Sequence, residues 1–482
     1  MRVEDFLSSS AIRYPGKTAL VDGSRRTSYA QMDAMANRFG QILRRCGLQR
    51  GDRVVIFAAS STEAVAAIFG TLKAGGVFSP VNPTTKADKL AFILSNCRAE
   101  AIVTQSRLMP IVAEALQQSP SVKSCIVVDG EPGLVPGAIS MQQAMEQVPA
   151  IRPEEPGIDI DLAMLIYTSG STGFPKGVMM THQNIDHAST SITTYLRNTP
   201  DDIILNVLPI SFDYGLYQVL MAFKLGMTLV LEKSFAFPQL ILKKINDEKV
   251  TGLPLVPTIA AILLQMPSLK PGMFPTLRYI TNTAAALPPA HIRRLQELFP
   301  STLIFSMYGL TECKRCTYLE PEDLERKIGS VGKAIPNTEA WVINDEGQRC
   351  KPGEVGELVI RGGHVMQGYW ENPEATAKCL KPGRYPWEKV LYTGDLFTTD
   401  EEGYLYFVGR KDDIIKTRGE KVSPKEVENT LYMLNGVKEA AVIGVPDPVL
   451  GMAIKAMIVP AEGVELSEQQ IIRHCAQHLE DF

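Results

Sequence analysis

The sequence predicts an α/β protein with a large N-terminal body of mostly parallel sheets, a small barrel-like unit and a small mobile α+β lid at the C-terminus. Over the first three hundred residues or so, short apolar runs alternate with helical patterns, which is typical of parallel strands covered by helices. After about residue 335, apolar runs are separated by short Gly and Asp turns, which predicts antiparallel strands. Beyond residue 411, one helix and two strands make the lid.

The first strand–helix pair is expected at residues 54–57 and just after them. Ser60 is predicted to cap the helix, with Glu63 three residues on as its capping-box partner. One helical face then carries the apolar side chains of Val65, Ile68, Phe69 and Leu72. Further strands of the body are expected at residues 102–103, 126–128, 203–205, 229–231, 253–256 and 303–305.

The later elements divide the chain into a body, residues 1–411, and an incomplete lid, residues 412–482. The barrel-like part of the body spans about 336–411, followed by a charged linker turn at 409–413. Its strands are expected at residues 340–343, 356–361 and 403–408. The lid is expected to contain a helix at 424–433 and strands at 440–444 and 453–459.

Composition excludes several classes of protein. A net charge of -4 over 482 residues argues against a nucleic-acid binder that neutralises phosphates. No apolar run is long enough to span a bilayer, and the N-terminus lacks a signal-peptide pattern, which predicts a cytoplasmic protein. The eight cysteines are scattered and are expected to be reduced. Cys313 and Cys316 form a C-x-x-C, but no second Cys pair with zinc spacing lies nearby, which argues against a metal or redox role.

A segment rich in Gly, Ser and Thr at residues 167–177 follows an apolar run at 162–166 that is typical of a buried strand. Glycine lets the backbone approach an anion, and successive N–H groups in such a turn form a concave anion site. Lys176 adds a mobile positive charge. The segment therefore predicts a polyphosphate site. It is not the P-loop of kinases and GTPases, because Lys176 is followed by Gly177 and not by the Ser or Thr that holds Mg²⁺.

The segment instead resembles the phosphate loop of the AMP-forming adenylate-forming enzymes, which include acyl-CoA synthetases, peptide-synthetase adenylation domains and luciferases. Five further segments resemble motifs of that family, in the family's order: residues 72–83, 307–313, 392–395, 409–416 and 419–426. The resemblance implies that a carboxylate attacks the α-phosphate of ATP to give acyl-AMP and pyrophosphate. A thiol, of CoA or of a carrier protein's phosphopantetheine, then displaces AMP.

The resemblance also implies roles for residues that bind ATP and Mg²⁺. Glu312 matches the carboxylate that helps to hold Mg²⁺, and Thr311 matches a residue near the α-phosphate. Lys176, Thr311 and Glu312 are the predicted catalytic residues. The residues that match the family's β,γ-phosphate cradle are Thr168, Ser169, Gly170, Ser171, Thr172, Gly173 and Lys176.

The rest of the nucleotide site follows from the same resemblance. Asp395 matches the carboxylate that accepts both ribose hydroxyls, a role suited to an acceptor-only group. Arg410 matches an arginine that also reaches the ribose, and Tyr308 is expected to stack on adenine. Residues 282–285 resemble the loop beside adenine and the acyl group, and Asp412 stands at the family's hinge.

The acid pocket is predicted to begin at Phe212-Asp213. Amino-acid-activating domains of the family have Phe-Asp there, and the carboxylate pairs with the substrate ammonium. Asp213 therefore either meets a substrate cation or caps the following helix. Arg315 could meet a second substrate carboxylate, Glu312 or Asp213. The other predicted pocket residues are Tyr214, Tyr217, Pro254, Ile280, Asn282, Met307 and Cys316.

The chain stops where the family's lid continues, before the Gly-Lys string whose lysine contacts the carboxylate and the α-phosphate. We expect a truncated chain that binds ATP and adenylates slowly. The leading function is an acyl-CoA ligase for a small carboxylic acid. The alternatives are a free-standing adenylation enzyme that loads an amino or acyl group onto a carrier protein in trans, and a nucleotide-binding pseudoenzyme.

Overall fold

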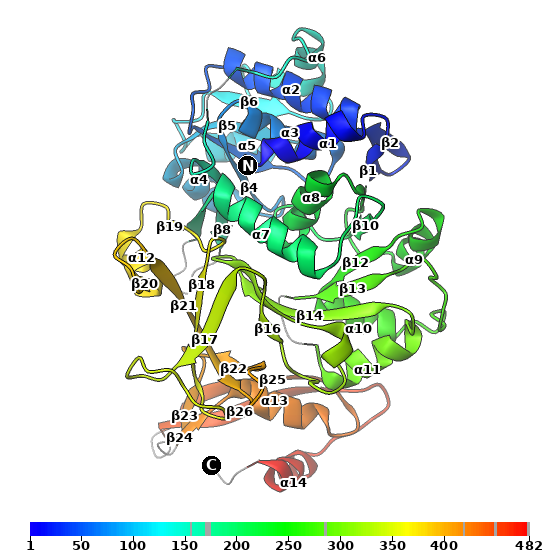
Figure 1. The fold of residues 1–482 in the computed structure, drawn as a ribbon, viewed down its shortest axis with the longest axis vertical. Coiled ribbons are helices and arrows are strands. Elements are labelled where there is room, and N and C mark those ends of the chain that lie inside the picture. The colour runs from blue at the N-terminus through cyan, green and yellow to red at the C-terminus, as the bar shows by residue number, and fades with distance from the viewer. Residues whose placement is uncertain (155–156, 169–174, 284–286, 418–419, 448–450, 480–482) are drawn as a thin grey trace.

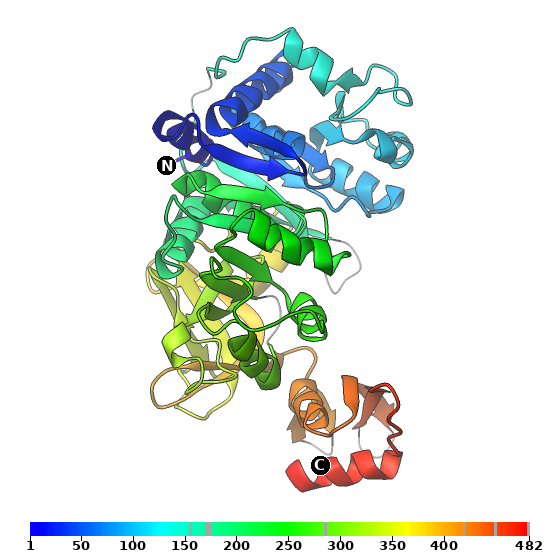
Figure 2. The ribbon, with the colours of Figure 1, turned by 90° about the vertical axis from the view of Figure 1, so that its right-hand side faces the viewer.

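The computed structural model describes residues 1–154, 157–168, 175–283, 287–417, 420–447 and 451–479. The predicted α/β body and small C-terminal lid are confirmed. Figure 1 shows the N-terminal sheets at the top, the antiparallel strands below them and the lid at the bottom. In Figure 2, turned by 90°, the lid hangs below the body and the chain enters it through one extended connection.

One layer of the body is an eight-stranded sheet with the order β19-β9-β8-β4-β3-β5-β6-β7. The pairs among β8, β4, β3, β5, β6 and β7 are parallel, while β9 is antiparallel to both β8 and β19. The strands are β3 (Arg53–Phe57), β4 (Val77–Pro80), β5 (Ala99–Thr104), β6 (Ser124–Val127), β7 (Ile139–Ser140), β8 (Leu162–Thr168), β9 (Lys176–Thr181) and β19 (Gly368–Tyr369).

A second layer is a nine-stranded sheet with the order β16-β15-β14-β13-β12-β10-β11-β1-β2. Its central strands are parallel, and β2, β15 and β16 are antiparallel additions at the two edges. The strands are β1 (Thr18–Asp22), β2 (Arg25–Ser28), β10 (Ile203–Asn206), β11 (Thr228–Leu231), β12 (Gly252–Leu255), β13 (Tyr279–Asn282), β14 (Leu303–Leu310), β15 (Lys314–Leu319) and β16 (Lys333–Ala334).

Helices cover these sheets, as Figures 1 and 2 show. In the described body the helices are α1 (Glu4–Arg13), α2 (Tyr29–Arg45), α3 (Thr62–Lys73), α4 (Ala87–Asn96), α5 (Met109–Leu116), α6 (Met141–Glu146), α7 (His182–Tyr195), α8 (Asp213–Leu225), α9 (Pro238–Asp247), α10 (Pro257–Leu264), α11 (Pro289–Leu298) and α12 (Pro373–Cys379). Short 3-10 turns lie at Ser106–Leu108 and Pro321–Asp323. None of the helices in the described residues has both the length and the apolar character that crossing a bilayer requires.

The start of α3 corrects one prediction. Ser61, not Ser60, is the N-cap, and its hydroxyl accepts from the backbone N–H of Ala64. Ser60 has another role, because its Oγ accepts from the N–H of Ile210 at 3.3 Å. Sequence spacing alone could not separate two adjacent serines, since either one can cap a helix.

The antiparallel unit after residue 335 is a five-stranded sheet with the path β17-β18-β21-β20 and β22 on β21. The strands are β17 (Thr338–Ile343), β18 (Gly356–Gly362), β20 (Leu380–Pro382), β21 (Lys389–Thr399) and β22 (Leu405–Arg410). The pairings of the described residues form an open path, so this sheet is not a closed barrel. Its neighbour β19 leaves the unit and joins the edge of the eight-stranded sheet.

The lid has a four-stranded sheet with the order β24-β23-β26-β25. The strands are β23 (Ile415–Thr417), β24 (Glu420–Val422), β25 (Val437–Asp447) and β26 (Gly451–Pro460), and the helices are α13 (Pro424–Tyr432) and α14 (Glu468–His478). Its core is small and is built on the buried residues Ile415, Val422, Val427, Leu431 and Val442.

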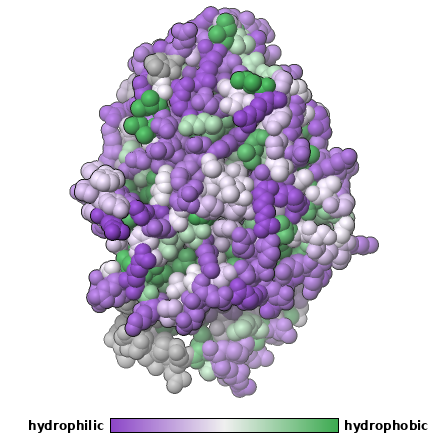
Figure 3. Space-filling view, viewed as in Figure 1, coloured by the Kyte–Doolittle hydropathy of each residue, from purple (hydrophilic) through white to green (hydrophobic). Residues whose placement is uncertain are grey.

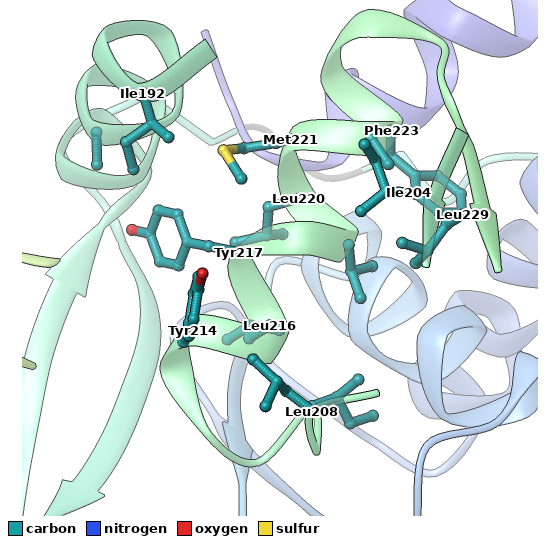
Figure 4. Packing of buried hydrophobic residues seen from close by; sticks show 14 of the residues in the cluster. Ile192, Ile204, Leu208, Tyr214, Leu216, Tyr217, Leu220, Met221, Phe223 and Leu229 are labelled. Atoms are coloured by element: carbon teal, nitrogen blue, oxygen red, sulfur yellow. The ribbon is translucent and has the colours of Figure 1, made fainter. Parts of the chain in front are cut away.

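The body's core runs through both large sheets. Around α8, Tyr214 and Tyr217 extend to one side of the helix, while Phe223 lies with Ile204 and Leu229 on the other (Figure 4). Outside, polar residues cover most of the face seen in Figure 3, and hydrophobic residues form scattered patches. The same helix thus anchors the core and presents aromatic side chains toward the site described next.

Candidate active site

A cavity of about 340 Å³ opens where several strands of the two large sheets end. Parallel α/β sheets commonly bind ligands at such strand ends. The described residues that line it are Thr168, Phe212, Asp213, Tyr214, Thr283, Gly309, Leu310, Thr311, Glu312, Lys314, Arg315, Tyr369, Cys379, Leu391, Tyr392, Thr393 and Arg410. Several parts of the chain that are distant in sequence therefore contribute to one wall.

The phosphate side of the cavity starts from the antiparallel pair β8–β9. Thr168 closes β8 and stands opposite Lys176, the first residue of β9. The Nζ of Lys176 lies 5.3 Å from the ring centroid of Tyr369, a cation–π distance. Between these strands, the predicted cradle residues Ser169, Gly170, Ser171, Thr172 and Gly173 lie outside the described residues.

Glu312 is held by the same tyrosine. The Tyr369 hydroxyl donates to Glu312 Oε1 at 2.7 Å, and the N–H of Met366 donates to the Glu312 carbonyl at 2.8 Å. Burial, followed by the negative charge of Glu312, raises the pKa of Tyr369, so the phenol stays a donor. A single carboxylate beside a polyphosphate site fits Mg²⁺, which commonly takes one or two carboxylates and completes its shell with phosphate oxygens and water.

The Tyr-Gly-Leu-Thr-Glu segment has a backbone that only glycine satisfies at its second position. The register between β14 and β15 shifts between Tyr308 and Gly309. A Cβ at Gly309 would stand 1.7 Å from the carbonyl oxygen of Lys314. This close approach turns the chain so that Thr311 and Glu312 both line the cavity.

Tyr308, Asp395 and Arg410 form a connected group on the nucleotide side. The Tyr308 hydroxyl donates to Asp395 Oδ2 at 2.5 Å, and the Arg410 Nε lies 3.1 Å from Asp395 Oδ1. Burial raises the pKa of Asp395, while the Tyr308 hydrogen bond and the Arg410 charge oppose that rise. Arg410 lines the cavity, with Tyr308 and Asp395 directly behind it. The predicted adenine and ribose residues therefore contact one another.

On the acid side, Asp213 has a partner within the chain. Its Oδ2 lies 3.4 Å from the Nζ of Lys314, which also donates to the Thr311 carbonyl at 2.8 Å. Asp213 is the first residue of α8, and the N-cap position belongs to Phe212, without a side-chain cap hydrogen bond. The helix-cap interpretation of Asp213 is therefore wrong, and within the described residues the buried Lys314 pairs with the carboxylate. Burial lowers the pKa of Lys314, while Asp213 opposes this.

Arg315 is buried against aromatic rings. Its guanidinium carbon lies 4.5 Å from the Tyr214 ring centroid and 5.8 Å from that of Tyr217. Its Nε has no hydrogen-bond partner among the described residues. No described carboxylate forms an ion pair with it, so the predicted contacts with Glu312 and Asp213 are absent from the described residues. Arg315 lines the cavity with a charge that no described anion balances.

Six predicted pocket residues lie behind the described wall instead of on it. Tyr217 packs behind Arg315, Met307 accepts a hydrogen bond from Tyr195, and Cys316 contacts Cys313. The other three, Pro254, Ile280 and Asn282, belong to the buried strands β12 and β13. In this part of the chain, Thr283, directly after β13, is the described residue that lines the cavity.

The structure also brings in residues that the sequence reasoning missed. Tyr369 links Lys176 to Glu312, and Lys314 balances Asp213. Lys314 has a signal in the sequence, since it lies within two residues of Glu312; Tyr369 has none nearby. Cys379 also lines the cavity and was not predicted, whereas Thr283 and Tyr392 belong to the predicted segments 282–285 and 392–395.

Asp412, the predicted hinge residue, is exposed between the body and the lid. Next to it, Lys411 is tied to the body: its Nζ lies 3.0 Å from Glu357 Oε2, and its N–H donates to the Gly394 carbonyl. After it, a cavity of about 570 Å³ separates Arg410, Asp412 and Asp413 from the lid residues Pro424 and Lys425.

Comparisons with known proteins agree with this geometry. Residues 7–370 match the AMP-binding enzyme family, and residues 426–482 match the AMP-binding enzyme C-terminal domain. The long-chain-fatty-acid–CoA ligase FadD13 of Mycobacterium tuberculosis is 33% identical over 458 residues, covering 94% of this chain and 87% of that protein. The indoleacetate–CoA ligase of Aromatoleum aromaticum is 30% identical over 476 residues, covering 98% and 91%.

A solved structure shares the whole fold. ATP-bound MatB from Rhodopseudomonas palustris superimposes with a TM-score of 0.89 at 29% sequence identity, covering 100% of this chain and 93% of that one. The similarity spans both the body and the lid.

Proposed function

This chain belongs to the AMP-binding enzyme family, and we propose that it joins a small carboxylic acid to coenzyme A through an acyl-AMP intermediate. In the first step an acid oxygen bonds to the α-phosphorus of ATP, and the bond to pyrophosphate breaks. In the second step the CoA sulfur bonds to the acyl carbon, AMP leaves, and the thiol proton goes to solvent. The observation that carries the proposal is the contact of Tyr369 with both Lys176 and Glu312 on the cavity wall.

The adenylation step brings two anions together, so the site must supply positive charge at fixed positions. Lys176 would meet the phosphates, with its approach limited by the Tyr369 ring. Glu312, held by the hydroxyl of that ring, would contribute a ligand to Mg²⁺. Mg²⁺ would neutralise phosphate charge there. Because one phenol contacts both groups, the lysine and the carboxylate keep a fixed relation to each other.

The nucleotide would displace contacts that the chain makes with itself. Asp395 accepts from Tyr308 and lies against Arg410, so ribose hydroxyls would replace or share the Tyr308 hydrogen bond. A freed Tyr308 ring could then stack on adenine, beside Phe397, whose ring meets it edge-on at 4.8 Å. These internal contacts keep the buried carboxylate hydrogen-bonded in the meantime.

The acid side favours a plain acid over an amino acid. Lys314 already balances Asp213, so a substrate ammonium is not needed there. An added cation would face both Lys314 and Arg315. We therefore place CoA ligation of a plain acid ahead of amino-acid loading onto a carrier protein.

Arg315 limits further which acids we expect as substrates. Two cations and one carboxylate, Lys314, Arg315 and Asp213, leave one positive charge in excess on this wall. The unpartnered Nε of Arg315 is a buried donor, and a donor of this kind is costly unless something accepts from it. A short acid with a second acceptor at its far end, such as a carboxylate or a carbonyl, would supply that acceptor.

The test uses the two half-reactions separately. ATP–pyrophosphate exchange is measured with plain acids, their ω-carboxylate analogues and their α-amino analogues. Thioester formation is then measured from ready-made acyl-AMP and CoA, with phosphopantetheine alone as the comparison. We expect exchange with plain or ω-carboxylated acids and thioester formation with CoA.

Exchange restricted to α-amino acids would contradict the plain-acid proposal and restore the carrier-loading alternative. Exchange with no acid, together with no thioester from acyl-AMP, would favour a protein that binds the nucleotide without catalysis. Glu312→Gln, in the cavity, should slow the ATP–pyrophosphate exchange. Its matched control is Glu322→Gln, in an exposed turn ten residues further along the chain, which should leave the exchange rate unchanged.

A further inference from the structure

Two cysteines and one histidine meet in the interior beneath the Glu312 turn. Cys313 and Cys316 flank Lys314 and Arg315, and His364 comes from the loop after β18. Both sulfur atoms and a ring nitrogen of His364 lie within 4.8 Å of one another, and all three residues are buried. The sulfur atoms are 2.8 Å apart. None of these three residues lines the cavity that Glu312 and Arg315 line.

The histidine has a ring nitrogen without a partner. His364 is fully buried, and its Nε2 makes no hydrogen bond among the described residues. Its Nδ1 lies 3.4 Å from the Thr338 hydroxyl. An imidazole nitrogen buried without a partner is costly, so the site either tolerates that cost or supplies a ligand that the nitrogen can bind.

The backbone is shaped around this ring. A Cβ at Gly362 would stand 2.6 Å from Cε1 and Nδ1 of His364. A Cβ at Gly363 would stand 2.6 Å from the ring of His187, which stacks on His364 at a centroid distance of 5.8 Å. Two consecutive glycines therefore make room for two imidazoles, and the position of His364 is fixed from both sides.

We propose that Cys313, Cys316 and His364 bind one Zn²⁺ ion, or another thiophilic ion of the same charge, as a structural site. Two thiolates and an imidazole are ligands that Zn²⁺ prefers, while Mg²⁺ and Ca²⁺ prefer oxygen. Water would take the fourth position. This site is independent of the Mg²⁺ expected at Glu312, which is a carboxylate position on the cavity side.

The charges of the proposed site balance, so that metal binding leaves no unpaired ion in the interior. Binding breaks two S–H bonds and releases two protons to solvent, and nothing is oxidised or reduced. The product, two thiolates with one divalent cation, is neutral, so its burial avoids the cost of an isolated charge.

Binding requires a small adjustment. Zn–S bonds of about 2.3 Å in a tetrahedral site set two sulfur atoms roughly 3.8 Å apart, so the thiols must separate by about 1 Å. Cys313 lies in the turn between β14 and β15, which can rotate more easily than the strand that carries Cys316. The expected movement is therefore in Cys313, next to Glu312.

The ion would join two segments that already touch. The N–H of Met366 donates to the Glu312 carbonyl, and His364 is two residues before Met366. A metal bridge from Cys313 to His364 would fix that turn to the 362–366 loop and hold the Glu312 carboxylate in place. The metal would thus stabilise the position of the turn that carries Glu312.

The first measurement is the metal content of the full chain. The protein is purified with reducing agent, stripped with a chelator, and reloaded with Zn²⁺ or Co²⁺ while excess Mg²⁺ occupies oxygen-ligand sites. We expect about one Zn²⁺ per chain and, with Co²⁺, the strong near-ultraviolet absorption of cobalt bound to thiolates. Less than a tenth of an equivalent of Zn²⁺ would overturn the proposal.

Variants identify the ligands. Cys313→Ala and Cys316→Ala should each abolish the thiolate–cobalt absorption, and His364→Gln should weaken Zn²⁺ binding at least tenfold. Cys125→Ala is the control, since Cys125 is another buried thiol, in β6 and outside the cluster, and this variant should keep full metal binding. Unchanged metal content in Cys313→Ala would overturn the assignment.

A test on the unaltered protein does not depend on variants that fold. Titration with a mercurial thiol reagent should release one Zn²⁺ per chain as two thiols react, and Zn²⁺ should protect those two thiols from alkylation. A mass 2 Da lower with Cys313 linked to Cys316, and no metal, would show a disulfide in place of the metal site and overturn the proposal.

Discussion

The two sides of the cavity differ in how their charges are balanced. On the nucleotide side, Glu312 and Asp395 accept from the neutral hydroxyls of Tyr369 and Tyr308, and the cation that pairs with Asp395, Arg410, is exposed. On the acid side, Asp213 is paired with the buried Lys314. Neutral donors leave a carboxylate its charge for a ligand, whereas a buried cation uses that charge within the protein. The difference indicates which carboxylates are available to substrates.

The largest expected effect is on the nucleotide side. Glu312→Gln keeps the size of the side chain but removes the charge that Mg²⁺ needs, so the ATP–pyrophosphate exchange rate should fall by about 100- to 1,000-fold. Tyr369→Phe, which removes only the donor to Glu312, should cost less, about tenfold. Equal losses in both variants would mean that the phenol, and not the carboxylate charge, dominates.

The pair of Asp213 and Lys314 on the acid side should contribute to the free energy of unfolding. Lys314→Met leaves Asp213 without its cation in a largely buried place and should lower the free energy of unfolding by about 3 kcal/mol. Asp213→Asn strands the lysine and should have a similar cost. The double variant should recover much of the loss, as measured by urea unfolding. Additive losses would break the comparison, because the two groups would then be independent.

Asp395 should control ATP affinity with a smaller effect. Asp395→Asn should raise the KM for ATP by about tenfold, which matches the loss of one charge-assisted hydrogen bond. Because the pKa of Asp395 is raised, its protonation begins at a higher pH than for an ordinary aspartate. The KM for ATP should therefore rise as the pH falls into the mildly acidic range, and the variant should lose this dependence. As a control, the unaltered protein should have a higher KM for 2′-deoxy-ATP than for ATP, and this difference should disappear in Asp395→Asn.

The smallest effect expected is a change of preference. Arg315→Met should lower exchange with acids that carry a second carboxylate by about tenfold relative to plain acids, measured as the ratio of kcat/KM values. Arg315→Lys keeps the charge but not the planar guanidinium group. Its ratio of kcat/KM values should lie between those of the unaltered protein and Arg315→Met. A uniform loss on all acids would assign Arg315 to packing against Tyr214.

The sequence predicts the nucleotide side better than the acid side for a physical reason. Asp395 and Arg410 stand opposite each other on adjacent strands, and Glu312 follows Tyr308 within one turn, so short motifs contain most of that arrangement. The Asp213–Lys314 pair instead joins the start of α8 to the end of a hairpin far along the chain. Pairing of this kind depends on how elements pack, which residue spacing does not encode.

The same limit applies to Cys313 and Cys316, because His364, which lies close to them in the fold, is distant from them in the sequence. The sequence shows no second Cys pair near Cys313 and Cys316, and it is the fold that brings His364, from the loop after β18, to within 4.8 Å of both sulfur atoms. The predicted mostly parallel body and the change to antiparallel strands after residue 335 were confirmed, since periodicity and turn residues are local signals. The cap of α3 was not predicted correctly, and the antiparallel strands form an open sheet where a barrel-like unit was expected.

The position of β1 has a consequence for how the chain is made. Leu20 on β1 pairs in parallel with Leu229 on β11, and α1 is tied to α8 through the Ser10 hydroxyl and the Phe223 carbonyl. During synthesis the β1–β2 hairpin emerges early but finds its parallel partner only after Leu229 has left the ribosome. Until then it exposes an unpaired edge that can join another chain. The rate of translation through β10 and β11 should therefore govern how much of this protein is recovered in soluble form.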